Sequence, residues 1–135
     1  MATFALIHGG GGSAWDWHLV VPELRELGHD PVAVDLPCED ESAGWREYAD
    51  AVVDAVGERQ DVIVVGHSLG GFTAPLVTAR VPVSGLVLVA AMVPRPGETG
   101  SEWWSASGYE AAVKGTDMPD DEVELFYNRT PPELV

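Results

Sequence analysis

Four short runs of apolar residues recur along the first two thirds of the chain, and each fits a buried β-strand. The runs lie at residues 3–7, 31–34, 62–65 and 86–90. They are continuously apolar, which is typical of strands in a sheet covered on both faces. The stretches between them read as helices that begin near Asp16, Ser42 and Ser68. Strand and helix thus alternate three times before a closing strand, an order that predicts a parallel α/β sheet with helices on both faces.

The helix between the second and third runs has the clearest signals. Ser42 is a suitable N-cap, and Gly57 lies where the helix would stop. Between these two residues, large apolar side chains recur at the spacing of one helix face, at Trp45, Tyr48, Val52 and Val56. The first and third helices contain Pro22 and Pro75. Because proline removes a backbone donor, the sequence leaves the ends of these two helices open.

The character of the sequence changes after Pro94. No acidic residue occurs between Asp61 and Glu98, as expected of a core, whereas the segment that follows is rich in proline, glycine and acidic residues. We therefore expect the N-terminal part of a core over residues 1–94 and the start of a lid or cap over residues 95–135.

Composition narrows the class of protein. The chain has 135 residues, of which 46% are hydrophobic, enough for one domain with a core. The formal net charge of -15 disfavours nucleic acid and an anionic membrane as partners. A single cysteine, Cys38, excludes a disulfide framework and a cysteine-based metal site, and no metal or organic cofactor is expected. Because neither a signal peptide nor a transmembrane run follows Met1, we expect a soluble cytoplasmic protein.

The third apolar run leads directly into the sequence Gly66-His67-Ser68-Leu69-Gly70, a Gly-x-Ser-x-Gly motif. A strand, this motif and a helix in succession describe a serine on a sharp turn, with its hydroxyl exposed for attack. We interpret Ser68 as a nucleophile. A chance match in a glycine-rich chain is the alternative, but the strand before the motif and the helix after it favour the catalytic interpretation.

Four consecutive glycines, residues 9–12, follow the first run. Glycine lets backbone amides approach a ligand closely, and such amides can form the oxyanion hole of an acyl-transfer enzyme. The amide of Leu69, the residue after the nucleophile, would be a second donor. The alternative interpretation of the four glycines is a phosphate-binding loop, but no Lys-Ser/Thr pair follows them. A dinucleotide fingerprint fails because Trp15 stands where a glycine is needed.

A serine nucleophile requires a base, yet no histidine follows Ser68. The histidines precede it, at His8, His18, His29 and His67. We expect His67 to point away from Ser68 and to form part of the pocket wall or the core. His8 is expected to hydrogen-bond within its turn, and Asp35 to support the turn after its strand.

Two adjacent aromatic residues, Trp103 and Trp104, lie in the expected lid. They can line an acyl or alcohol pocket or pack the lid down, and packing is the commoner use of such residues. Together with Gly9 and His67 they complete the set of pocket candidates.

These features together resemble the α/β-hydrolases, and more narrowly the branch that contains plant methyl esterases and hydroxynitrile lyases. The resemblance extends from Ala2 to about Pro94 and rests on Leu6-Ile7-His8-Gly9-Gly10, Ala14-Trp15-Asp16-Trp17, Gly28-His29, Val34-Asp35-Leu36-Pro37 and Gly66-His67-Ser68-Leu69-Gly70-Gly71. It implies Ser68 as the nucleophile and the amides of Gly10 and Leu69 as the oxyanion hole. It also implies that a triad Asp or Glu and a histidine lie beyond Val135, so that the chain is the N-terminal part of a longer enzyme.

The hypothesis from sequence is therefore a serine hydrolase that acts on a small-molecule carboxylic ester or related acyl substrate through an acyl-enzyme on Ser68. The 135-residue chain alone is expected to be inactive, because it lacks the base. A hydroxynitrile-type lyase is one alternative, although the resembling lyases carry a hydroxylated residue in place of Gly9. A non-catalytic ligand-binding protein on the same fold is another. The fourth strand is expected to leave an apolar sheet edge through which chains can self-associate.

Overall fold

The computed structural model describes residues 1–108 of the chain. Its elements follow the order β1 (Thr3–Ile7), a 3-10 helix (Ala14–Trp17), α1 (Val20–Glu26), β2 (Asp30–Val34), α2 (Trp45–Val56), β3 (Val62–His67), α3 (Gly70–Thr78), β4 (Gly85–Val89) and α4 (Gly100–Ser107). They divide into two compact units. The first is Met1–Met92 and the second begins at Val93.

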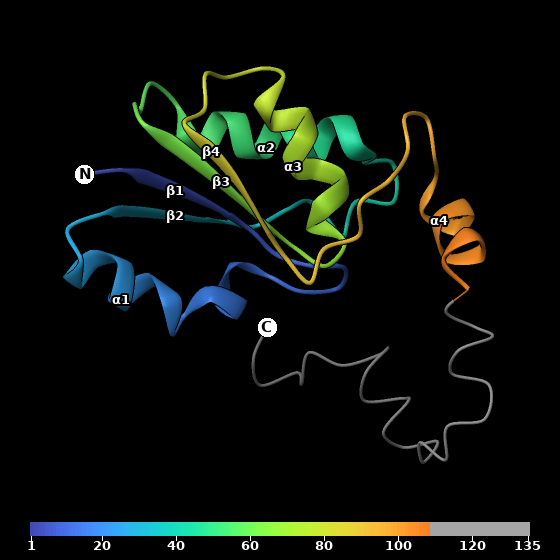
Figure 1. Ribbon diagram of the computed structural model, residues 1–135, viewed down its shortest axis with the longest axis horizontal. Helices are drawn as coiled ribbons and strands as arrows, with labels where there is room; N and C mark the ends of the chain where they lie inside the picture. The colour runs from blue at the N-terminus through green and yellow to red at the C-terminus, as the bar shows by residue number, and fades with distance from the viewer. Residues whose placement is uncertain (109–135) are drawn as a thin grey trace, which may run out of the picture. The chain divides into compact units, whose positions relative to one another are not determined.

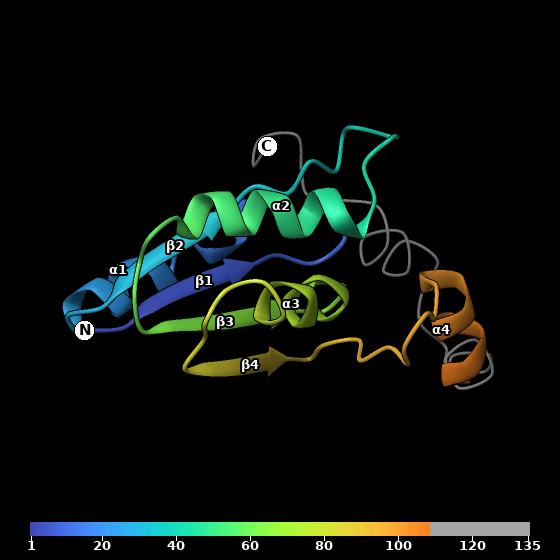
Figure 2. The ribbon, with the colours of Figure 1, turned by 90° about the horizontal axis from the view of Figure 1, so that it is seen from above.

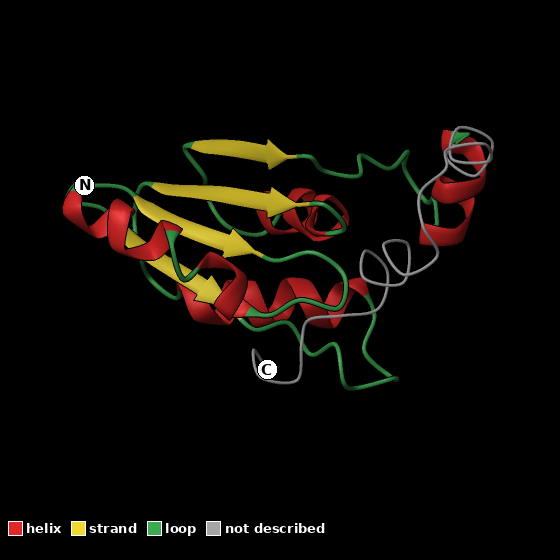
Figure 3. Ribbon diagram, turned by 90° about the horizontal axis from the view of Figure 1, so that it is seen from below, coloured by secondary structure: helices red, strands yellow, loops and turns green. Residues whose placement is uncertain are grey.

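The four strands form one parallel sheet in the order β2-β1-β3-β4. Helices α2 and α3 cover one face, and α1 lies on the other face (Figures 1 and 2). Figure 3 shows the strands running in one direction, so that the loops after them all lie at the carboxyl ends of the strands. The predicted α/β fold with a parallel sheet is thereby confirmed.

Apolar clusters hold the layers together on both sides of the sheet. The larger cluster, on the side of α2 and α3, is Ala5, Ile7, Val34, Leu36, Ala49, Val52, Val56, Val62, Val64, Ala74 and Val77. The smaller cluster, on the side of α1, is Leu6, Trp17 and Val65. Successive residues of a strand point to opposite faces, so β1 and β3 supply both clusters. This is why their sequences are apolar at consecutive positions.

Helix α2 begins later than the sequence predicted. Its N-cap is Gly44, and Ser42 lies in the preceding turn, where its amide and hydroxyl donate to the Asp40 carboxylate at 2.9 and 2.6 Å. These bonds hold the pKa of Asp40 below its usual value. The Glu47 carboxylate accepts a hydrogen bond from the Gly44 amide at 2.7 Å. The prediction of Ser42 as the cap was wrong because the serine satisfies a local turn instead.

The two prolines occupy different places in their helices. Pro22 is the third residue of α1, where backbone amides have no partner within the helix, so its missing N–H removes no bond. Pro75 lies inside α3 and removes the bond to the carbonyl of Gly71. The helix still continues to Thr78, whose hydroxyl donates to the Pro75 carbonyl at 2.7 Å. The predicted first helix is a 3-10 turn followed by α1.

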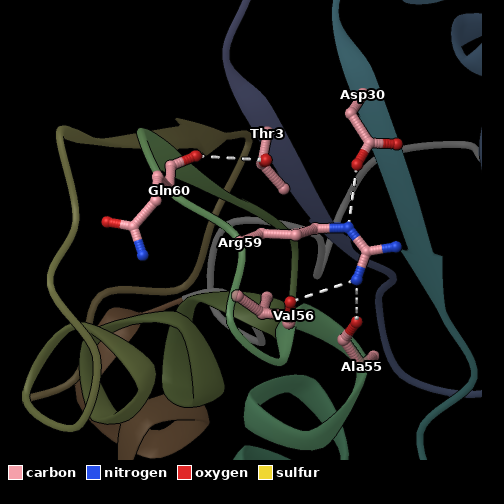
Figure 4. Close-up of polar contacts among 6 residues, drawn as sticks. All are labelled: Thr3, Asp30, Ala55, Val56, Arg59 and Gln60. Atoms are coloured by element: carbon pink, nitrogen blue, oxygen red, sulfur yellow. Dashed lines mark hydrogen bonds and ion pairs between the residues drawn. The ribbon is translucent and has the colours of Figure 1, made fainter.

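Arg59 ties the end of α2 to the sheet (Figure 4). Its Nε donates to the Asp30 carboxylate at 2.8 Å. One terminal nitrogen donates to the carbonyls of Ala55 and Val56 at 3.0 and 3.1 Å. Carbonyls in the last turn of a helix lack partners within it. Arg59 therefore caps α2 and also anchors the loop that leads into β3.

The second unit contains α4, which starts with a reciprocal cap. The Thr99 hydroxyl accepts from the Glu102 amide at 3.2 Å, and the Glu102 carboxylate accepts from the Thr99 amide at 2.7 Å, which lowers the pKa of Glu102. Trp103 and Trp104 pack edge to face with ring centroids 5.2 Å apart. The Trp103 indole donates to the Val93 carbonyl at 3.1 Å. The pocket role of these tryptophans and the lid remain predictions, and residues 109–135 lie outside the described part.

Within residues 1–108, strand β4 is an open edge of the sheet. It pairs with β3 on one side, and its residues Leu86, Val87, Leu88 and Val89 are each 42–43% exposed. Val87 lies beside Val65 on the face of α1, and Leu88 lies beside Gly66 on the other face. An uncharged apolar edge with unpaired backbone groups is a template for another strand. Among residues 1–108, no helix is long and apolar enough to cross a membrane.

We predict that the 135-residue chain self-associates through β4. Size-exclusion chromatography should show species larger than a monomer, and Val87→Lys should shift the chain toward the monomer because it places a charge on the open edge. Leu27→Lys is the matched control, since Leu27 is 73% exposed at the end of α1. A monomeric wild-type chain, or equal responses to the two substitutions, would contradict the prediction.

Candidate active site

Ser68 occupies the tight turn between β3 and α3. Its φ of +51° lies in the left-handed region that residues other than glycine rarely adopt. The Ser68 amide donates to the Val89 carbonyl at 3.1 Å, and the Ser68 carbonyl accepts from the amides of Gly71 and Met92 at 3.0 and 2.9 Å. The end of β4 and the residues after it therefore fix the backbone of the proposed nucleophile.

The glycines around Ser68 are required by close approach of the backbone. A Cβ on Gly66 would lie 2.9 Å from the Gly70 carbonyl oxygen, and one on Gly70 would lie 3.0 Å from the Ile7 carbonyl oxygen. A Cβ on Gly71 would collide with the Met92 carbonyl oxygen. The spacing of the motif therefore follows from how closely α3 packs against β1, β3 and the segment after β4.

The glycine loop after β1, residues 9–12, approaches the same turn. A Cβ on Gly9 would lie 3.1 Å from the Ser68 Cβ, and one on Gly10 would lie 2.9 Å from the Leu69 Cδ2. The structure thus brings together the residues that the sequence assigned to the nucleophile and the oxyanion hole, although they are almost sixty positions apart in sequence.

His8 holds the glycine loop in place. Its side chain is buried, its Nδ1 lies 2.7 Å from the Gly9 carbonyl oxygen, and its Nε2 lies 3.1 Å from the Leu36 amide nitrogen. The Leu36 N–H must donate to a lone pair on Nε2, so the ring is the neutral form that carries its proton on Nδ1 and donates to Gly9. His8 therefore links the loop after β1 to the end of β2. Both ring nitrogens are engaged, which leaves neither to serve Ser68 as a base.

His67, which directly precedes Ser68 in the sequence, packs against the smaller apolar cluster. The ring of His67 meets that of Trp17 edge-on, with centroids 6.2 Å apart. Among residues 1–108, no hydrogen bond joins His67 to Ser68. Asp35 accepts from the Ala14 amide at 2.8 Å and so fixes the start of the 3-10 helix. Neither residue is placed as the base or the acid of a triad with Ser68.

A cavity of about 180 Å³ opens beside the glycine loop and the first turns of α3. Its wall includes Gly10, Leu36, Trp45, Tyr48, Leu69 and Thr73. Gly9 also lines the cavity. The sequence marked Gly9, Gly10 and Leu69 as site residues, and it placed Trp45 and Tyr48 on the core face of α2. Thr73 is the one polar residue among residues 70–77, and this was the available signal for it.

A tyrosine and the only cysteine of the chain meet at this cavity. The Tyr48 hydroxyl donates to the sulfur of Cys38, which together with partial burial raises the pKa of Tyr48 to about 12. Tyr48 is therefore protonated at neutral pH and acts as a hydrogen-bond donor. In the described part of the chain, no group of His, Cys, Asp and Glu side chains is placed to hold a metal ion.

The sequence and the structure of the chain match those of known proteins. A sequence model described as "Alpha/beta hydrolase family" matches residues 4–134. The chain belongs to this family. The probable esterase PIR7A of Oryza sativa is 38% identical to it over 109 residues, which cover 70% of this chain and 41% of that protein. Norfluorocurarine synthase 1 of Strychnos nux-vomica is 30% identical over 96% of this chain and 53% of the synthase.

Solved structures agree with this assignment. The crystal structure of polyneuridine aldehyde esterase matches with a TM-score of 0.68 and 29% identity, over 82% of this chain and 48% of the esterase. The sequence of that enzyme from Rauvolfia serpentina is 32% identical over 105 residues. The resemblance to the plant methyl esterase branch is thus confirmed. The chain spans between 40% and 53% of the length of these relatives.

The role assigned to His8 predicts a loss of stability when its side chain is removed. His8→Ala leaves the Gly9 carbonyl and the Leu36 amide without their partner, and we expect the free energy of unfolding to fall by about 2–4 kcal/mol. Urea denaturation of the purified chain measures this change. His18→Ala is the control, because His18 is exposed on the 3-10 turn and its loss should cost less than about 1 kcal/mol. Equal losses in the two variants would show that the link through His8 contributes nothing.

Proposed function

We propose that this chain carries the nucleophile and the oxyanion hole of a serine hydrolase that cleaves carboxylic esters or related acyl substrates. Ser68 Oγ attacks the acyl carbon, the alcohol leaves, and water hydrolyses the acyl-enzyme. The negative charge that develops on the acyl oxygen is held by the amides of Gly10 and Leu69. The observation that carries the proposal is the left-handed turn of Ser68 beside the glycine loop.

The relatives support an ester as the substrate. The probable esterase PIR7A and polyneuridine aldehyde esterase both bear esterase names, and the family model matches residues 4–134, which contain the turn and the glycine loop. We therefore assign small-molecule esters as the substrate class.

The base and the acid of the triad are proposed to lie beyond Val135. No histidine follows Ser68 in the chain, His8 is fully engaged by hydrogen bonds, and His67 packs against Trp17. The relatives contain roughly as much sequence again as this chain covers. A histidine supplied from that part would remove the Ser68 proton and return it to the leaving alcohol.

A lyase reaction on the same scaffold has less support. The lyases that the chain resembles carry a hydroxylated residue at the position of Gly9. A side chain there would begin only 3.1 Å from the Ser68 Cβ, so the loop would have to move to admit one. A non-catalytic binding protein is the remaining alternative, and the reactivity of Ser68 distinguishes it from an enzyme.

Ser68→Ala tests the proposed nucleophile in the full-length protein. We expect hydrolysis of a p-nitrophenyl ester to fall to the background rate, because the attacking hydroxyl is removed and the fold is kept. Ser84→Ala is the matched control: the Ser84 hydroxyl bonds to Asp61 just before β4, at the opposite end of the strands from Ser68, and turnover should stay at the wild-type level. Turnover that survives Ser68→Ala in a folded protein would rule out the assignment, and a full-length protein without esterase turnover would favour the binding alternative.

A further inference from the structure

Ala90, the residue after β4, has a strained backbone. Among residues 1–108, three residues other than glycine have a positive φ: Asp61 at +52°, Ser68 at +51° and Ala90 at +43°. Aspartate visits this left-handed region more readily because its short polar side chain can hydrogen-bond locally, whereas alanine has no such group. Strain of this kind persists only where the surrounding structure imposes it, and it gathers at functional sites. The conformation of Ala90 therefore calls for a cause in its surroundings.

Ala90 lies opposite the proposed nucleophile in the sheet. The register of β3 and β4, continued by one residue, pairs Ser68 with Ala90. In a regular parallel ladder, the Ser68 amide would donate to the Val89 carbonyl and the Ser68 carbonyl would accept from the Ala91 amide. The first bond is present at 3.1 Å, but the second comes from the Met92 amide, at 2.9 Å. One extra residue thus lies between the two bonds.

The left-handed backbone of Ala90 accommodates this extra residue. Glycine does the same in one class of β-bulge, and bulges are common beside active sites. The shift brings Met92 against α3: its side chain is buried, and its carbonyl oxygen is the atom with which a Cβ on Gly71 would collide. Met92 is therefore held by α3 while its amide holds the Ser68 carbonyl. Val89 holds the Ser68 amide, so that the backbone of Ser68 is fixed on both sides.

We propose that Ala90 is a positioning residue for Ser68. Its left-handed backbone supplies the extra residue that lets Val89 and Met92 hold the amide and the carbonyl of the serine at the same time. The Ala90 side chain is exposed in the described part of the chain, so the effect comes from its backbone. The role in catalysis rests on the proposed function of Ser68, whereas the hold on the turn does not.

Ala90→Val tests this role in the full-length protein. A β-branched residue is a poor fit to a positive φ, so valine should break the bond between Met92 and Ser68. We expect kcat on a p-nitrophenyl ester to fall about 100-fold because the attacking serine is misplaced, with little change in KM. Ala90→Gly adopts the same φ without strain. It should keep the wild-type kcat and raise the melting temperature by about 2 °C.

Asp61→Val is the matched control. Asp61 has a similar φ but precedes β3, at the opposite end of the strands from Ser68. This substitution should lower the melting temperature and leave kcat unchanged. Hydrogen-exchange mass spectrometry gives a readout that does not depend on turnover. The Met92 amide should exchange at least about tenfold faster in Ala90→Val, and at the wild-type rate in Asp61→Val.

Three results would overturn the proposal: wild-type kcat in Ala90→Val, an equal loss of kcat in Asp61→Val, or a lower melting temperature in Ala90→Gly. The last result decides even if Ala90→Val does not fold, because glycine destabilises an extended residue and stabilises a left-handed one. A full-length protein without turnover would instead refute the esterase function. The exchange rate of the Met92 amide would then decide whether Ala90 holds the turn.

Discussion

The left-handed turn at Ser68 is the constraint on which the rest of this structure depends. A non-glycine residue in that region costs about 1–3 kcal/mol and persists only when its surroundings fix it. Here the fixing groups come from β4 and the residues after it, through the hydrogen bonds of Ser68 to Val89 and Met92. Because Gly71 packs directly under the Met92 carbonyl, α3 can start only where it does. The position of the serine hydroxyl is therefore set by the order of the strands in the sheet.

The position of the glycine loop, residues 9–12, also depends on the order of the strands in the sheet. β1 lies between β2 and β3, so the loop that follows it reaches both the end of β2 and the serine turn. His8 bonds the loop to Leu36 on one side, and the absence of side chains at Gly9 and Gly10 lets it approach Ser68 and Leu69 on the other. A parallel sheet of these three strands thus brings Ser68, the proposed nucleophile, close to the amides of the proposed oxyanion hole. The open edge at β4 follows from the same topology, because within residues 1–108 the strand that holds the Ser68 amide pairs with β3 alone.

Much of this arrangement could be predicted from the sequence, and the exceptions have physical reasons. Consecutive apolar residues in the strands predicted a sheet covered on both faces, and the Gly-x-Ser-x-Gly spacing reports the tight packing of α3. The predicted start of α2 was wrong because a serine can cap a helix or close a turn. In this structure the Asp40 carboxylate accepts hydrogen bonds from Ser42 and so stabilises the turn. The cavity was missed because Thr73, Trp45 and Leu36 come from separate elements. Their proximity is a property of the packing, which no local pattern encodes.

We propose that backbone packing around α3 positions the Ser68 hydroxyl for attack. The most direct test is the kcat of the full-length protein on a p-nitrophenyl ester after Gly71→Ala, with Gly100→Ala as the control. A Cβ on Gly71 would collide with the Met92 carbonyl oxygen, whereas a Cβ on Gly100 would meet no atom within 4 Å. We expect Gly71→Ala to displace the segment that holds Ser68 and to lower kcat by about 100-fold, and Gly100→Ala to leave kcat unchanged. A folded Gly71→Ala variant with wild-type kcat would contradict the account.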